Sequence, residues 1–329
     1  MPASLIVRRT ESWFRRHQRP LPWRKRYEPY EIWVSEVMAQ QTRIDVVLQY
    51  FERFVARFPA IESLAEATED EVTAAWSGLG YYRRARMLRE GARDVVQRFG
   101  GRLTSNVDEL TSISGIGRYT AGAIASIAFD VAAPIVDGNV ARVLSRLFAI
   151  REPPLMREAW RRAEQLVALA KSPRDFNQGL MEIGALICTP RKPQCAICPL
   201  RAECATRSDA LPLPKAKPRT RELHIPLYFV TDRAGRVLMR RECGRLMTSM
   251  FHLPHGTTSL FAAPPLKVDR PKSLGAFRHT VTNRRITFEV FAARGSKRAG
   301  YDWIDPATLS AIPHPSYVRK ALRIAGIDF

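Results

Sequence analysis

Four of the five cysteines in this 329-residue chain lie in one short stretch, which restricts how that stretch can fold. Cys188, Cys195, Cys198 and Cys204 follow the spacing C-x6-C-x2-C-x5-C. Thiolates held so close together need a positive centre, so we expect the stretch to close around a metal ion or cluster. Zinc commonly binds four cysteines, but it usually pairs them in two C-x2-C knuckles, and only one such pair occurs here. The spacing alone leaves zinc and an iron–sulfur cluster open. It indicates a reducing compartment rather than a disulfide framework.

The chain is strongly basic. Lys and Arg number 52 against 32 Asp and Glu, a formal charge of +20 at pH 7. This excess predicts a polyanionic partner, nucleic acid before any other, although a merely basic surface is the plain alternative. The longest apolar stretch, residues 120–136, is interrupted by Ser126, Asp130 and Pro134, and the first 20 residues hold no unbroken apolar segment. We therefore expect no membrane span and no secretory signal.

The spacing of apolar residues changes after Cys204. Residues 1–205 read as a succession of helices. Apolar residues follow the helical i, i+3, i+4 spacing in a segment that begins near Pro29 and again from Val140 to Leu147. Residues 206–221 combine three prolines with several basic residues and predict an extended basic linker. Strand-like stretches rich in β-branched and aromatic residues follow at 225–231, 236–240 and 286–292. We predict a multidomain chain, with an all-α domain over 1–205 and an α+β domain over 222–329. The isolated Cys243 is expected to be a buried small apolar residue.

Residues 107–128 read as two short helices joined by a glycine turn. Ser114-Gly115-Ile116-Gly117 forms the predicted hairpin, and the second helix starts near Arg118. Glycine permits left-handed backbone angles and lets a phosphate approach the N–H groups at a helix start. Many helix pairs also turn on glycine without binding anything, so this motif alone is weak evidence for DNA binding.

Glu36 and Asp137 form a candidate catalytic pair. The neighbours of Glu36 are mostly apolar, which predicts partial burial, although a helical Glu more often lies on a solvated face. A rise of about two pKa units would leave about one Glu36 in six protonated at pH 7, enough to protonate a purine leaving group. Asp137 precedes a predicted helix and reads first as its N-cap, a position that also favours the ionised carboxylate. Cleavage of a glycosidic bond uses one acid, which protonates the leaving group, and one carboxylate anion, which faces the positively charged sugar. Glu36 and Asp137 could supply these two groups.

Several motifs together resemble the MutY adenine DNA glycosylases of the helix-hairpin-helix-Gly/Pro-Asp superfamily. They are LPWR (21–24), SEVMAQQT (35–42), GLGYYRRAR (78–86), SGIGRYTAGAI (114–124), DGNVARVL (137–144), FNQGLMEIGALICT (176–189) and the cysteine spacing. The resemblance covers residues 1–205 almost continuously. It implies a six-helix module over 28–134, an iron–sulfur module over 1–27 and 135–205, and a [4Fe–4S] cluster on the four cysteines. Residues 222–329 resemble the family's Nudix-like mismatch-reading domain more loosely.

The resemblance implies excision of adenine from double-stranded DNA where it faces 8-oxoguanine or guanine. Glu36 matches the acid that protonates the base, Asp137 matches the carboxylate that stabilises the sugar cation or its adduct, and Tyr119 and Asn139 match residues that support this intermediate. Further matches on the DNA or base are Trp23, Arg24, Gln40, Gln41, Tyr81, Gly115, Gly117, Gln178 and Thr282. Gln41 and Tyr81 match residues inserted into the duplex, although Tyr81 or Tyr82 could equally be a core tyrosine. The resemblance also implies a monomeric, cytoplasmic, nucleoid-associated repair enzyme.

Three positions refine this expectation. Tyr119 replaces the lysine with which lyase relatives resembling endonuclease III form a Schiff base, so we expect a monofunctional glycosylase. Val281-Thr282-Asn283 replaces the Phe-Ser-His tip common in the family, so strong discrimination for 8-oxoguanine is not expected. Ala39 replaces a larger apolar residue, and no Nudix hydrolase box is present. The alternatives are a mismatch thymine or uracil glycosylase of the same superfamily, and a non-catalytic cluster-bearing DNA-binding protein.

Overall fold

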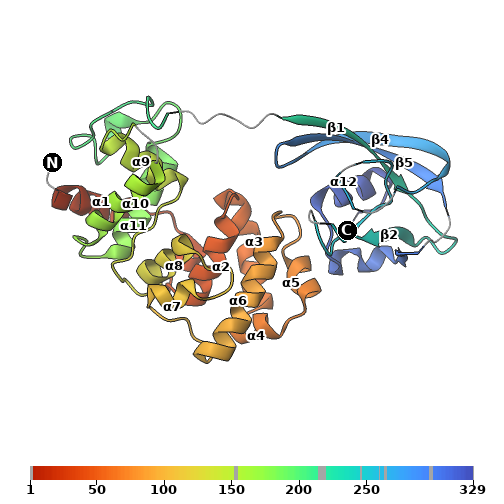
Figure 1. The fold of residues 1–329 in the computed structure, drawn as a ribbon, viewed down its shortest axis with the longest axis horizontal. Helices are drawn as coiled ribbons and strands as arrows, with labels where there is room; N and C mark the ends of the chain where they lie inside the picture. The colour runs from red at the N-terminus through yellow and green to blue at the C-terminus, as the bar shows by residue number, and fades with distance from the viewer. Residues whose placement is uncertain are drawn as a thin grey trace. The chain divides into compact units, whose positions relative to one another are not determined.

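The computed structural model describes residues 3–151, 155–213, 220–244, 247–258, 260–262, 265–295 and 299–328 (Figure 1). Contacts between residues divide it into two compact units. The first joins Met1–Glu66 to Met87–Lys215, and the second joins Ala67–Arg86 to Ala216–Phe329. The predicted domain boundaries at 205 and 222 stay predictions. The division by contacts differs from them, because it groups residues 67–86 with the C-terminal part.

The predicted helical character of residues 1–205 is confirmed. Their elements are α1 (Ala3–His17), η1 (Pro22–Arg24), α2 (Pro29–Ala39), α3 (Ile44–Arg57), α4 (Ile61–Glu66), α5 (Glu69–Ala75), α6 (Arg83–Phe99), α7 (Val107–Thr111), α8 (Arg118–Ala123), η2 (Ile124–Ala128), α9 (Gly138–Leu147), α10 (Leu155–Val167), α11 (Pro173–Glu182), η3 (Ile183–Ile187) and η4 (Cys195–Ile197). Among the described residues, no helix is long and apolar enough to cross a membrane.

Two packing features of the first unit position its chemistry. Helix α2 starts with Pro29 at its first turn, where a missing N–H costs nothing, and Ile32 to Met38 are buried on every side. Helices α1 and α11 approach closely because Gly179 has no side chain: a Cβ there would lie 2.7 Å from Cγ2 of Thr10. Helices α9 and α10 complete this core, and three of the cluster cysteines pack against it.

The C-terminal residues form the predicted α+β arrangement. The strands are β1 (Arg221–Phe229), β2 (Val237–Arg241), β3 (Phe251–His252), β4 (Asp269–Val281), β5 (Arg284–Arg294) and β6 (Tyr301–Ile304), followed by η5 (Pro306–Ala311) and α12 (Ser316–Ile324). Two three-stranded sheets have the orders β1-β5-β4 and β3-β2-β6, with β1 and β5 parallel. Phe288 of β5 stacks on Tyr317 of α12, with ring centroids 4.6 Å apart, in the core of this part. The Nudix-like assignment stays a prediction.

The predicted linker over residues 206–221 stays a prediction. Within it, Leu211 is buried and its carbonyl accepts a 2.6 Å hydrogen bond from the buried Arg146 guanidinium. A buried guanidinium needs several acceptors, and this backbone supplies one of them. Residues 214–219 of the predicted linker lie outside the described residues. Cys243 is exposed rather than buried, in the loop that follows β2.

Candidate functional site

Glu36 is a buried acid on the central helix α2. Its exposed fraction is 7%, and the Tyr119 hydroxyl donates a 2.7 Å hydrogen bond to its Oε2. Burial raises the pKa of Glu36 to about 7, against the opposing hydrogen bond from Tyr119, and the charge of Asp137 raises it further. The predicted burial is therefore confirmed. The carboxyl is poised to be protonated and to give up its proton near neutral pH.

Asp137 is the N-cap of α9, as its position before the helix predicted. Its Oδ1 accepts a 2.7 Å hydrogen bond from the backbone N–H of Val140, and its Oδ2 accepts a 2.9 Å bond from the Asn139 side chain. These two bonds hold the carboxylate in place at the start of α9. The charge of Asp137 is close enough to act on Glu36.

Arg24 and Gln178 meet at the same site. The Arg24 Nε donates a 2.8 Å hydrogen bond to Gln178 Oε1, and the Arg24 charge acts on Glu36. Arg24 also pairs with Glu182 across 2.7 Å, and Glu182 accepts two further bonds from Arg19. Trp23 is buried with its ring edge-on to a phenylalanine of α3, so it packs in the core beside this site.

Two residues of this site were missed from the sequence. Glu182 follows Gln178 by one helical turn, a spacing that could have indicated it. Arg142 donates to Asn139 Oδ1, to the Gly184 carbonyl and to the Cys188 carbonyl, at 2.9, 2.6 and 2.8 Å. Arg142 thereby ties the partner of Asp137 to the start of the cysteine loop. Nothing in its sequence neighbourhood distinguished it from a solvated arginine.

The glycine turn between α7 and α8 is present, and its two glycines act differently. Gly115 has a φ of +79°, the left-handed conformation expected there, and a Cβ would collide with Met87. Gly117 has an ordinary φ of −94° as the N-cap of α8, and a Cβ there would meet no atom within 4 Å. The space beside the first N–H groups of α8 is therefore open at Gly117.

The remaining predicted DNA contacts lie at turns. Gln40 reaches Thr120 of α8, at 3.4 Å, and Gln41 is exposed with a φ of +57°. Tyr81 is half exposed with a φ of +49°. Thr282 is exposed at the β4–β5 hairpin with a φ of +55°, an unusual conformation for a β-branched residue. Tyr81 and Thr282 belong to the second unit, and the other predicted site residues belong to the first.

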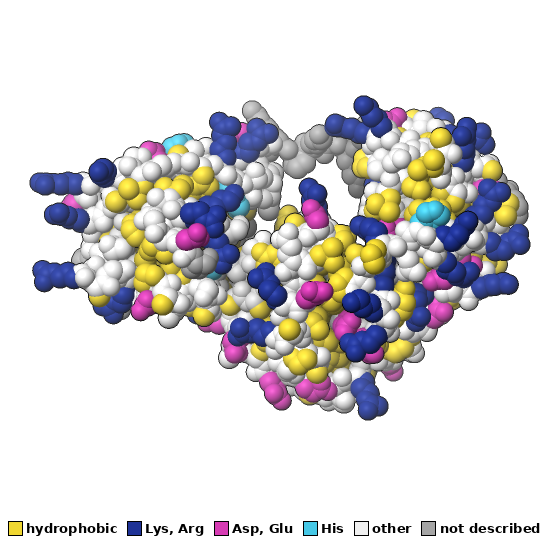
Figure 2. Space-filling model, turned by 180° about the vertical axis from the view of Figure 1, so that it is seen from behind, with side chains coloured by type: hydrophobic (Ala, Val, Ile, Leu, Met, Phe, Trp, Pro, Cys, Tyr) yellow, Lys and Arg dark blue, Asp and Glu magenta, His cyan; other side chains and the backbone are white. Residues whose placement is uncertain are grey.

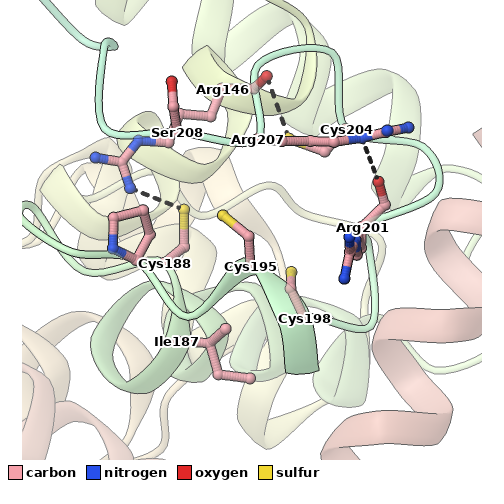
Figure 3. A pocket seen from close by; sticks show the side chains of 10 residues that line it. Arg146, Ile187, Cys188, Cys195, Cys198, Arg201, Cys204, Arg207 and Ser208 are labelled. Carbon is pink, nitrogen blue, oxygen red and sulfur yellow. Dashed lines mark hydrogen bonds between the residues drawn. The ribbon is translucent and has the colours of Figure 1, made fainter.

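The four cysteines line one pocket together with Arg146, Arg201 and Arg207 (Figure 3). In the part of the chain that the structure describes, no three Cys, His, Asp or Glu side chains converge tightly enough to hold a single metal ion. Four thiols that line one pocket are the donors that an iron–sulfur cluster takes. Burial raises the pKa of Cys198 to about 11, so a thiolate there needs a positive centre beside it. Arg146 donates to Cys188 Sγ at 3.2 Å.

Basic side chains cover much of the surface. Figure 2 shows Lys and Arg side chains over both units on the face in view, with fewer acidic side chains between them. Several arginine side chains stay exposed to solvent although they form an ion pair. Arg43, for example, pairs with Asp45 and still has 84% of its side chain accessible. A surface of this kind favours a polyanion.

Comparison with known proteins places this geometry in a family. Residues 34–169 match the model of the HhH-GPD superfamily of base excision DNA repair proteins. A solved thermostable thymine-DNA glycosylase is 30% identical, with a TM-score of 0.57, and the match covers 62% of this chain and 96% of that one. The chain belongs to the HhH-GPD superfamily. A trapped endonuclease III–DNA covalent intermediate, 23% identical with a TM-score of 0.53, shares the fold over 61% of this chain and 93% of that one.

The HhH-GPD chain also matches the model of the iron–sulfur binding domain of endonuclease III at residues 188–204. This match confirms the iron–sulfur alternative for the four cysteines. Two relatives are adenine DNA glycosylases. The one from Homo sapiens is 46% identical over 209 residues, 60% of this chain and 38% of that protein. The one from Buchnera aphidicola subsp. Acyrthosiphon pisum is 38% identical over 198 residues, 59% of this chain and 56% of that protein. The match spans about half or less of these relatives' length.

Proposed function

We propose that this HhH-GPD protein is a monofunctional adenine DNA glycosylase of base excision repair, which hydrolyses the bond between deoxyribose and an adenine that faces 8-oxoguanine or guanine. One observation carries the proposal. A buried carboxyl with a pKa near 7, Glu36, lies within electrostatic reach of a second carboxylate, Asp137. The adenine DNA glycosylases among its relatives support the choice of base.

Glu36 acts as the general acid. A pKa near 7 keeps about half of this group protonated at neutral pH, whereas an ordinary Glu would be almost entirely ionised. The Tyr119 hydroxyl engages Oε2, which leaves Oε1 to deliver the proton to the ring nitrogen of the extruded adenine. Protonation turns the base into a neutral leaving group, so the bond to the sugar breaks at a lower barrier.

Asp137 stabilises the positive charge that develops on the sugar. Its hydrogen bonds from Val140 and Asn139 hold the anion in one orientation before the bond breaks, so little reorganisation is needed in the transition state. Tyr119 has no amine and cannot form a Schiff base, so water completes the reaction and the strand stays intact.

The base must leave the duplex before this pair can act, because its bond to the sugar is inaccessible inside the stack. Gln41 and Tyr81, both exposed in left-handed turns, are proposed to enter the gap. The start of α8 at Gly117 receives a backbone phosphate, and Arg24 and Gln178 line the base pocket. Trp23 and Gln40 support that pocket from beside it.

Cys188, Cys195, Cys198 and Cys204 would hold a [4Fe–4S] cluster. When bound, the cluster supplies structural cross-linking of the loop rather than chemistry on the substrate. Arg201 and Arg207 line the same pocket. Their positive charges are proposed to bind a DNA phosphate there.

A panel of matched duplexes tests the proposal. Base release is measured from A·8-oxoguanine, A·G, T·G and U·G duplexes under single-turnover conditions, with Glu36→Gln as the matched inactive variant. The proposal expects release of adenine alone, and its loss in the variant. The likeness to a thymine-DNA glycosylase favours one second candidate, a thymine or uracil glycosylase. Release from T·G or U·G, without release of adenine, would establish that alternative instead.

A further inference from the structure

The turn between α5 and α6 presents Tyr81 in a strained conformation. Gly78 and Gly80 have φ values of +105° and +69°, and Tyr81 follows with +49°, rare for a residue that has a side chain. The Trp76 indole donates a 3.2 Å hydrogen bond to the Gly80 carbonyl. A strained apex of this kind persists only where its surroundings hold it in place.

The anchor of this turn is a carbonyl group from the far end of the sequence. The Tyr82 hydroxyl donates a 2.9 Å hydrogen bond to the carbonyl of His314, and the Ser77 hydroxyl donates a second one of 3.1 Å. The Tyr82 oxygen also accepts a 3.2 Å bond from the Gly78 N–H. Tyr82 is only 8% exposed, whereas its neighbour Tyr81 is 50% exposed. One tyrosine therefore fixes the turn while the next one projects from it.

The accepting carbonyl is held rigidly. Prolines flank it at 313 and 315, and proline restricts the backbone on both sides. The Pro313 carbonyl accepts a 2.8 Å bond from the N–H of Phe251 in β3, and His314 is buried with its Nδ1 2.9 Å from the Ile312 carbonyl. The His314 carbonyl is therefore a fixed reference point.

Two further contacts join the same two stretches of the second unit. Asp70 forms a two-pronged ion pair with Arg241 of β2, and Arg86 donates a 2.9 Å bond to the Thr248 carbonyl. All these residues lie in one compact unit, Ala67–Arg86 with Ala216–Phe329. C-terminal residues therefore contact the chain on both sides of the turn, at Asp70 before it and at Arg86 after it.

We propose that Tyr82 and the Pro313–His314–Pro315 segment are positioning residues that hold Tyr81 ready to enter the duplex. The inference rests on the proposed function for the role of Tyr81. The C-terminal residues thereby contribute to extrusion of the adenine, in addition to any contact they make with the opposite base. A pre-set wedge loses little conformational freedom on insertion, so the step is faster than with a mobile turn.

The test compares Tyr82→Phe with Tyr317→Phe in the full chain. Tyr317 is a buried tyrosine of the same unit whose hydroxyl has no hydrogen-bond partner among the described residues, so its removal controls for the loss of a phenol oxygen. Single-turnover adenine release is measured on two duplexes, one with A·8-oxoguanine and one with adenine opposite an abasic site. Extrusion of an unpaired adenine costs less, so it depends less on the wedge.

We expect Tyr82→Phe to slow release from A·8-oxoguanine by about 3- to 10-fold, the effect of one lost hydrogen bond. Release opposite the abasic site should change by less than about 2-fold, and Tyr317→Phe should change neither rate. Ser77→Ala, which removes the second donor to His314, should repeat the pattern of Tyr82→Phe. Equal losses on both duplexes, or no loss on either, would overturn the proposal.

A direct readout separates this inference from the proposed function. 2-Aminopurine placed beside the target adenine brightens when stacking is lost, whether or not any base is then released. The wild-type chain should brighten the probe on binding, and Tyr82→Phe should reduce or slow that signal. Brightening that depends on Tyr82 without release of adenine would refute the proposed function while leaving the positioning role intact. Release of adenine with a signal unaffected by Tyr82→Phe would refute the positioning role alone.

Discussion

Replacing Glu36 with Gln should make the protein inactive and should also stabilise it, by an amount that grows as the pH rises from 5 to 8. Burial raises the pKa of Glu36 from 4.5 to about 7. Because the native pKa lies above the unfolded one, the native state prefers the protonated carboxyl, and its stability falls as pH rises through this interval. Integrating between these two pKa values gives a penalty of about 1 kcal/mol at pH 5 and about 3 kcal/mol at pH 8. Gln resembles the protonated acid and carries no such penalty.

The assay is urea unfolding of the wild type and of Glu36→Gln at pH 5 and at pH 8, at constant ionic strength. The free energy of unfolding of the variant should exceed that of the wild type by about 1 kcal/mol at pH 5 and about 3 kcal/mol at pH 8. Glu66→Gln, at an exposed position, is the control and should change little at either pH. A stability gain for Glu36→Gln that is the same at both pH values would refute the reasoning, because the gain would then not come from a buried charge.

Three further results are expected. Tyr119→Phe removes a hydrogen bond that lowers the pKa of Glu36, so the alkaline limb of the pH–rate profile should move to higher pH; an unmoved limb would contradict this assignment. Gly184→Ala places a Cβ 2.7 Å from that of Asn139 and should cost about 1–3 kcal/mol in unfolding free energy and lower the single-turnover rate, whereas an unchanged rate would show that Asn139 need not be held in place. Cys198→Ser should reduce bound iron and visible absorbance in the purified protein; full iron content would exclude it as a ligand.

The helical character of residues 1–205, the burial of Glu36 and the cap position of Asp137 could be predicted from the sequence because each depends on a local pattern. Apolar neighbours around Glu36 indicated its burial, and Asp137 before an apolar stripe indicated a helix start. Arg142 could not be predicted, because two of its three acceptors, the Gly184 and Cys188 carbonyls, are brought to it only by the fold. The spacing of the cysteines did not distinguish zinc from an iron–sulfur cluster, whereas the match to the iron–sulfur binding domain of endonuclease III does.

The exposure of Cys243 could not be predicted from its residue type. Its neighbour Glu242 is the buried residue, and its carboxylate accepts hydrogen bonds from the Gly244 and Ala262 N–H groups. Local composition does not reveal a buried charged group of this kind.

The second compact unit is assembled from stretches that are made at different times. A ribosome releases residues 67–86 before residues 216–329. The helices on either side of the early stretch can close around their own core while the turn at Tyr81 still waits for its anchor. A chain that ends before residue 314 would therefore lack the carbonyl group that Tyr82 and Ser77 bind.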